Sequence, residues 1–227
     1  MAHAFFLGID AGPNDDGSSH AVAHTLLEKE QESSDDAATY RLDHIQHHTD
    51  VSSADDLAGR LQGFVAERPY IGRTSIIANR GNEFGEALVE ALRDRGLDPV
   101  AATLTQGTGT TSGGTDEMEV HMGGTDVIRT LADLYRDGKM VLEGHTTEVG
   151  SRLARDVQML AEQLNEADGN IEALETSTDG PSFDPEAIHV TSAALAAWLG
   201  AERSFDPSQH LKESPQTGSS SAERPEL

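Results

Sequence analysis

Three segments near the beginning of the chain have the hydrophobic pattern of β-strands. Residues 4–9 form a short apolar run that ends in Asp10 and is followed by a cluster of turn-forming residues, so this strand places an acid at its carboxyl end. Residues 20–28 and 39–47 have the composition of two further strands, and the polar stretch 30–36 between them has that of a hairpin loop. Three strands in succession predict a meander.

Helical periodicity begins after the third strand. Apolar residues recur at helical spacing over residues 53–65, behind a serine cap, and again over residues 85–95, which end at Gly96. Short strands are predicted at residues 74–78 and 99–105. The order of elements to this point, βββαβαβ, predicts an α/β fold with a mixed sheet and helices on its faces.

The second half of the chain is predicted to be mostly helical. Residues 106–125 are rich in glycine and threonine and are too long for an ordinary connection, which indicates a mobile loop or a local hairpin. Helical patterns follow over residues 126–137, 149–164 and 184–200, and residues 139–142 have the pattern of a short strand. The last predicted helix is rich in alanine, which favours close packing.

The composition divides the chain into one domain and a tail. Residues 1–201 are predicted to form a single α/β domain, and residues 202–227 a disordered acidic and polar tail. The absence of cysteine excludes a thiol nucleophile and a cysteine-ligated metal. The chain has no run of eighteen apolar residues and no signal-peptide pattern, so we expect a soluble cytoplasmic protein without a membrane partner.

The net charge of −24, from 40 acidic and 16 basic residues, changes the expected environment. Self-repulsion of this size destabilises a compact domain unless salt screens it, and the Debye length falls to roughly 3 Å at 1 M salt. The acidic residues are spread along the chain, so we interpret the composition as an adaptation to a salt-rich, halophilic cytoplasm. The same charge disfavours tight binding to a nucleic-acid backbone.

Four short motifs occur in a defined order along residues 4–200. They are Leu7-Gly8-Ile9-Asp10-Ala11-Gly12, Ile76-Ile77-Ala78 leading to Leu88-Val89-Glu90-Ala91-Leu92, Asp126-Val127-Ile128-Arg129-Thr130-Leu131 through Met140, and Ala187-Ile188-His189-Val190-Thr191. Together they resemble the RNase H-like nuclease domain at the C-terminus of phage terminase large subunits. The resemblance implies a five-stranded mixed sheet with the first strand central and the second antiparallel, flanked by helices.

The resemblance also implies a metal centre. Family members look like two-metal nucleases, in which carboxylates on the first strand, the fourth strand and the last helix hold two Mg²⁺ or Mn²⁺ ions about 3.5–4 Å apart. Carried onto this chain, the first acid is Asp10, the fourth-strand acid falls on Ala78, and the last helix keeps His189 but has Val190 and Thr191 in place of two acids. The chain therefore resembles a catalytically degenerate member.

Neighbouring acids offer an alternative metal site. Glu83 and Glu86 follow the fourth strand, and Glu186 lies one turn before His189. A rebuilt Mg or Mn site would combine Asp10 with Glu83, Glu186 and His189. In a chain with 40 acidic residues such proximity also arises by chance, and the acids then form an ordinary solvated surface.

Three further features have a structural and a functional interpretation. Asp10 is either a metal ligand or an acid that accepts hydrogen bonds from the turn after its strand. His44, His47 and His48 lie at the end of the third strand, where they form either a transition-metal site or an ordinary polar strand end. The glycine-rich stretch 107–124 lacks the phosphate-loop pattern, so no ATPase motor is expected.

Two functional hypotheses remain. The first is a stand-alone terminase-nuclease-like domain of phage, prophage or mobile-element origin, catalytically degenerate and acting as a binding or structural protein with DNA or a phage-type protein as partner. The second is an active Mg- or Mn-dependent DNA endonuclease with relocated acidic ligands. The first is favoured because the loss of the other carboxylates removes most of the charge that would hold the ions.

Overall fold

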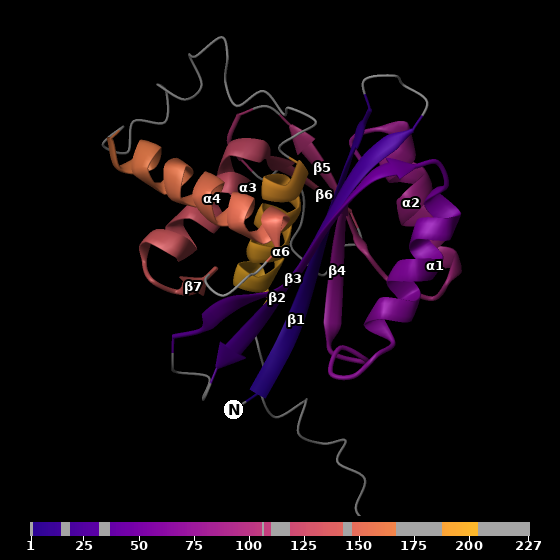
Figure 1. Ribbon diagram of the computed structural model, residues 1–227, viewed down its shortest axis with the longest axis horizontal. Helices are drawn as coiled ribbons and strands as arrows, with labels where there is room; N and C mark the ends of the chain where they lie inside the picture. Colours follow the sequence, from indigo (N-terminus) through magenta and orange to yellow (C-terminus); the bar gives the residue numbers. More distant parts are fainter. Residues whose placement is uncertain are drawn as a thin grey trace, which may run out of the picture.

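The protein folds into one mixed sheet with helices on both faces (Figure 1). The computed structural model describes residues 2–14, 19–31, 37–105, 107–109, 119–142, 147–166 and 188–203. The strands are β1 (Ala2–Pro13), β2 (His20–Gln31), β3 (Thr39–Val51), β4 (Thr74–Asn79), β5 (Val100–Thr105), β6 (Glu119–Gly123) and β7 (Met140–Val141). The helices are α1 (Ala54–Val65), α2 (Glu83–Asp94), α3 (Gly124–Arg136), α4 (Glu148–Glu166) and α6 (Ile188–Glu202).

The strand order is β6-β5-β4-β1-β2-β3-β7, which places β1 in the centre. Strands β1, β2 and β3 form an antiparallel meander, and β4 pairs with β1 in parallel. The α/β class, the meander, the central first strand and the antiparallel second strand are therefore confirmed.

The predicted number of five strands is wrong, because the described sheet has seven. The short strand expected at residues 139–142 is present as β7, which pairs in parallel with β3. The other addition, β6, lies in the stretch expected to be a loop or hairpin and pairs in parallel with β5. It contributes two buried apolar side chains, Val120 and Met122, too few for a clear periodic signal.

Side-chain caps determine where two of the helices begin. The Ser53 hydroxyl accepts a hydrogen bond from the Asp56 amide at 3.1 Å, as the serine before α1 predicted. Helix α2 begins two residues earlier than predicted, because the Asn82 side chain accepts a hydrogen bond from the Gly85 amide at 2.8 Å and so caps the helix.

Alternate side chains of β1 enter two different cores. Phe5, Leu7 and Ile9 pack against the α1–α2 layer, whereas Phe6 packs in the core that contains α6. The two layers lie on opposite faces of the sheet (Figure 1). At Gly8 the helix backbone approaches the strand directly: an added Cβ would lie 2.0 Å from the carbonyl oxygen of Ser192 in α6. Helix α6 is buried along almost its whole length, which agrees with its alanine-rich composition.

Some predictions fall outside the described residues. These are the proposed start of the last helix at Asp184, the candidate ligand Glu186, and the tail beyond residue 203. Within the described part of the chain, no helix is both long enough and apolar enough to cross a membrane.

Candidate functional site around Asp10

Asp10 lies near the carboxyl end of the central strand and is 4% exposed. Its Oδ1 accepts a hydrogen bond from the Ala11 amide at 3.0 Å and another from Asn79 Nδ2 at 2.8 Å. The side chain of Thr191, in the first turn of α6, is a third hydrogen-bond partner. Burial raises the pKa of Asp10 to about 6, although the three hydrogen bonds act in the opposite direction.

Sheet register and strand alternation determine which residues meet at this point. Ile9 of β1 pairs with Ala78 of β4, and both side chains enter the α1–α2 core. The next residue of each strand, Asp10 and Asn79, points to the other face, where α6 brings Thr191. The residue of β4 that faces Asp10 is therefore Asn79 rather than Ala78, the position expected from the sequence, because a shift of one residue reverses the face of the sheet.

Two asparagines fasten the loop between β4 and α2 to the end of β1. Asn79 Oδ1 accepts a hydrogen bond from the Gly81 amide at 3.0 Å, so its Nδ2 is turned toward Asp10. Asn82, besides capping α2, donates from Nδ2 to the Ala11 carbonyl oxygen at 2.7 Å. Asp10 thus faces an amide donor, a hydroxyl and a backbone N–H.

Among the described residues, the structure does not group the predicted ligands Glu83 and His189 with Asp10. Glu83 is exposed in the first turn of α2, as is Glu86, whose carboxylate lies 3.6 Å from Arg80 Nη2. His189 is buried, and its Nε2 lies 2.7 Å from Oδ2 of Asp156 in α4. Among the described residues, Asp10 belongs to no group of three His, Asp or Glu side chains with closely spaced ligand atoms.

In the described part of the chain, the site therefore contains one carboxylate and two neutral polar side chains. Asn79 and Asp156 were missed as partners, because the first lies one residue beyond the position assigned to the motif and the second lies 33 residues before His189. The strand does not end at Asp10 as predicted, because β1 continues to Pro13 and Ala11 is still part of it. Asp10 is therefore held by its own strand, by β4 and by α6, and not by a turn that follows it.

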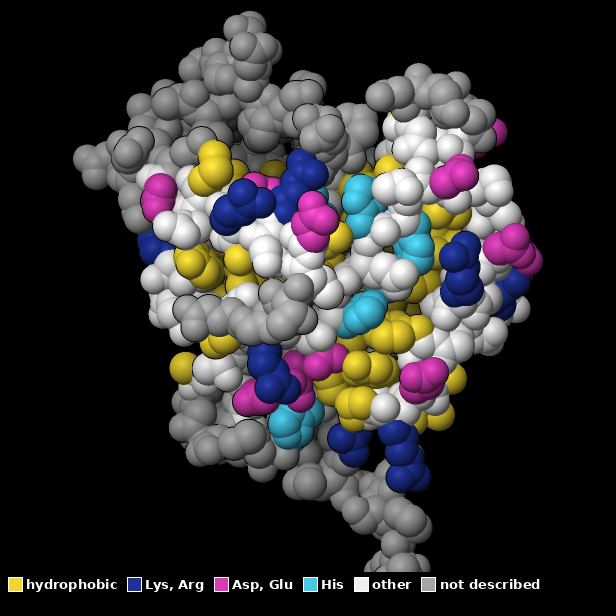
Figure 2. Space-filling model, viewed as in Figure 1, with side chains coloured by type: hydrophobic (Ala, Val, Ile, Leu, Met, Phe, Trp, Pro, Cys, Tyr) yellow, Lys and Arg dark blue, Asp and Glu magenta, His cyan; other side chains and the backbone are white. Residues whose placement is uncertain are grey.

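The histidines on β3 separate onto two faces. His44 and His48 flank His24 of β2, with ring centroids 5.4 Å from it in both cases, whereas His47 lies beside His189. Figure 2 shows histidine side chains along the strands in the middle of the view. Burial and the neighbouring histidines lower the pKa of His24 to about 3. The three rings stack in a row, and in the described part of the protein they form no convergent three-ligand group.

Comparison with protein-family models, curated proteins and solved structures finds no match for the chain.

Proposed function

We propose that this is an RNase H-like domain related to terminase nucleases, that it does not hydrolyse phosphodiesters, and that it acts as a binding or structural protein in a phage, prophage or mobile element. The order β5-β4-β1-β2-β3 with β2 antiparallel supports the relationship. The packing of the last helix against the central strand supports it as well.

One observation carries the proposed loss of catalysis. The positions that face Asp10 from β4 and α6 hold Asn79 and Thr191, which are neutral. A two-metal centre must balance a total ionic charge of +4 with several hard anionic oxygens, and a single carboxylate supplies one negative charge. The amide of Asn79 turns its NH₂ group toward Asp10, and a donor in that position repels a cation.

The charge of the chain favours a protein partner over DNA. Phosphate-backbone binding requires clustered lysine and arginine, whereas this sequence has 40 acidic and 16 basic residues. A phage-type protein with a basic surface is therefore the partner we propose. The alternative, an active Mg- or Mn-dependent endonuclease, would use the relocated acids Glu83, Glu86 or Glu186, the last of which lies outside the described residues, and it is an outcome of the test below.

Calorimetric titration with Mn²⁺ at high salt tests the proposal. Wild-type protein and Asp10→Asn should give the same heats, because no ion binds at Asp10. Asn79→Asp, alone and combined with Thr191→Asp, should create a Mn²⁺ site that disappears when Asp10→Asn is added.

Asn82→Asp is the control for charge, because it adds the same charge in the same loop and aspartate also caps helices, although it gives up the hydrogen bond from Nδ2 to the Ala11 carbonyl oxygen. It should create no site. Wild-type binding of Mn²⁺ that Asp10→Asn abolishes would contradict the proposed loss of the metal centre.

A further inference from the structure

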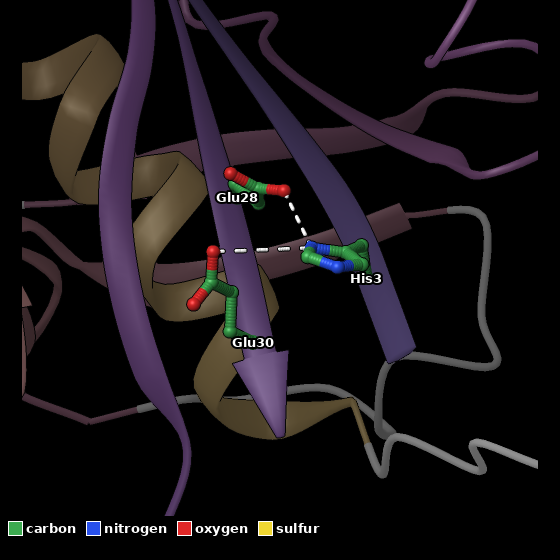
Figure 3. A group of neighbouring side chains, drawn as sticks. All are labelled: His3, Glu28 and Glu30. Carbon is green, nitrogen blue, oxygen red and sulfur yellow. Dashed lines mark hydrogen bonds and ion pairs between the residues drawn. The ribbon is translucent and has the colours of Figure 1, made fainter. Parts of the chain in front are cut away.

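A second group of potential ligands lies at the opposite end of β1. Figure 3 shows the imidazole of His3 pointing toward the carboxylates of Glu28 and Glu30. His3 Nδ1 lies 2.6 Å from Glu28 Oε1 and 3.9 Å from Glu30 Oε1. One ligand atom from each of the three residues lies within 4.8 Å of the others.

The register of the β1–β2 pair produces this convergence. His3 is directly opposite Glu30, and Glu28 lies two residues along the same face of β2, opposite Phe5. All three side chains therefore project from paired strands, and a site on a strand pair is held more precisely than one on a loop.

The position of Glu28 is fixed from a third strand. Its side chain is 7% exposed, and Arg41, its register partner on β3, contacts Oε2. This contact leaves Oε1 directed at His3. Arg41 Nη2 also lies 3.8 Å from Glu30 Oε1 and balances part of the negative charge. The guanidinium orients a ligand from outside the group, as partners beyond the ligand atoms do in many metal sites.

We propose that His3, Glu28 and Glu30 bind a divalent transition-metal ion of the Zn²⁺ type. Zinc ligands lie about 2.0–2.2 Å from the ion, so tetrahedral ligand atoms are roughly 3.3 Å apart. The observed 2.6 Å and 3.9 Å lie on either side of that spacing, and movements well under about 1 Å reach it. Water fills the fourth position.

The ligand set selects among ions. One imidazole nitrogen with two carboxylate oxygens suits Zn²⁺, whereas Mg²⁺ and Ca²⁺ prefer oxygen ligands alone. A bound ion would tie the beginning of β1 to the end of β2.

This site is independent of the proposed function. Asp10 lies seven positions after His3 in β1, a distance of about 23 Å along an extended strand. The donor sets also differ, since Asp10 has no histidine partner among its hydrogen bonds.

Zinc titration of tag-free, metal-free protein tests the inference, with calorimetry and thermal unfolding as the two readouts. We expect one saturable Zn²⁺ site per chain, an unfolding midpoint that rises with Zn²⁺, and no comparable effect of Mg²⁺. His3→Gln and Glu30→Gln alter side chains that are 34% and 30% exposed, so the fold should tolerate them. Each should weaken Zn²⁺ binding at least about tenfold.

Two control variants address other sources of zinc binding. His48→Gln removes a histidine of the His24 stack, and Glu90→Gln removes an exposed acid of α2. Both should bind Zn²⁺ like the wild type. An absence of saturable binding, or full binding by His3→Gln, would overturn the proposed site. If the three residues form only a structural ion-pair cluster, neither the wild type nor His3→Gln will bind Zn²⁺ saturably, and His3→Gln will be less stable than the wild type.

Discussion

Replacing Asp10 with asparagine is expected to stabilise the folded protein at neutral pH. The carboxylate is buried, and its pKa is raised from 3.8 to about 6. At 1.36 kcal/mol per pH unit, this difference corresponds to about 3 kcal/mol of lost stability once Asp10 is ionised. Asparagine has nearly the same shape, and its Oδ1 can still accept the hydrogen bonds from Ala11 and Asn79. We expect Asp10→Asn to gain about 1–3 kcal/mol at pH 7.

The pH dependence gives this prediction a definite sign. Because the folded-state pKa is the higher one, folded protein binds more protons than unfolded protein between pH 3.8 and about 6. The stabilisation from protonated Asp10 is therefore complete below pH 3.8 and is lost as the pH rises through 6. The advantage of Asp10→Asn should grow over that interval and level off above it.

Urea unfolding of both proteins at a series of pH values between 4 and 8, in high salt, measures this difference. Asp50→Asn, at an exposed position of β3, is the control and should show no such trend. If Asp10→Asn were less stable than the wild type at pH 7, the carboxylate would be a net stabilising group, and our explanation of its environment would be refuted.

Three further predictions concern stability. The thermal unfolding midpoint of the wild type should rise as the KCl concentration is increased from tens of millimolar to molar, because salt screens the charge of −24. Calorimetric scans that showed no such rise would remove the halophilic interpretation. Gly8→Ala places a Cβ 2.0 Å from a backbone oxygen and should lower the free energy of unfolding by about 3 kcal/mol or more. Gly63→Ala in α1, where an added Cβ meets nothing within 4 Å, should raise it by up to about 1 kcal/mol. Chemical denaturation measures both. The pKa of His24 falls from 6.5 to about 3 on folding, so between these pH values the unfolded protein takes up a proton at His24 that the folded protein does not. The free energy of unfolding should therefore fall by about 1.4 kcal/mol per pH unit as the pH drops from 6.5 toward 3. His24→Gln should flatten that dependence, and an equally steep curve for the variant would assign the effect to other groups.

Local patterns predicted most of the elements correctly. The apolar run of β1, the serine cap of α1 and the alanine content of α6 are properties of short segments, and each led to the observed element. The strand β6 was missed because its pairing with β5 depends on residues far away in the sequence rather than on its own five.

The candidate site was harder to predict, because it depends on which face each residue occupies. Asp10 was identified from its position at the end of a strand, but its partner differs from the expected position by one residue, and one residue reverses the face. His189 has the residue type of a ligand, yet a nonlocal contact with Asp156 of α4 occupies its Nε2. His24 was not grouped with His44 and His48, since their contact depends on the β2–β3 register.

A nuclease assay tests the central proposal most directly. Duplex DNA is incubated with wild-type protein and with Asp10→Asn, at high salt, with Mn²⁺ or Mg²⁺. The proposed loss of the metal centre predicts no metal-dependent cleavage by either protein. Cleavage by the wild type that requires the metal and disappears in Asp10→Asn would contradict the proposal and identify the domain as an active endonuclease.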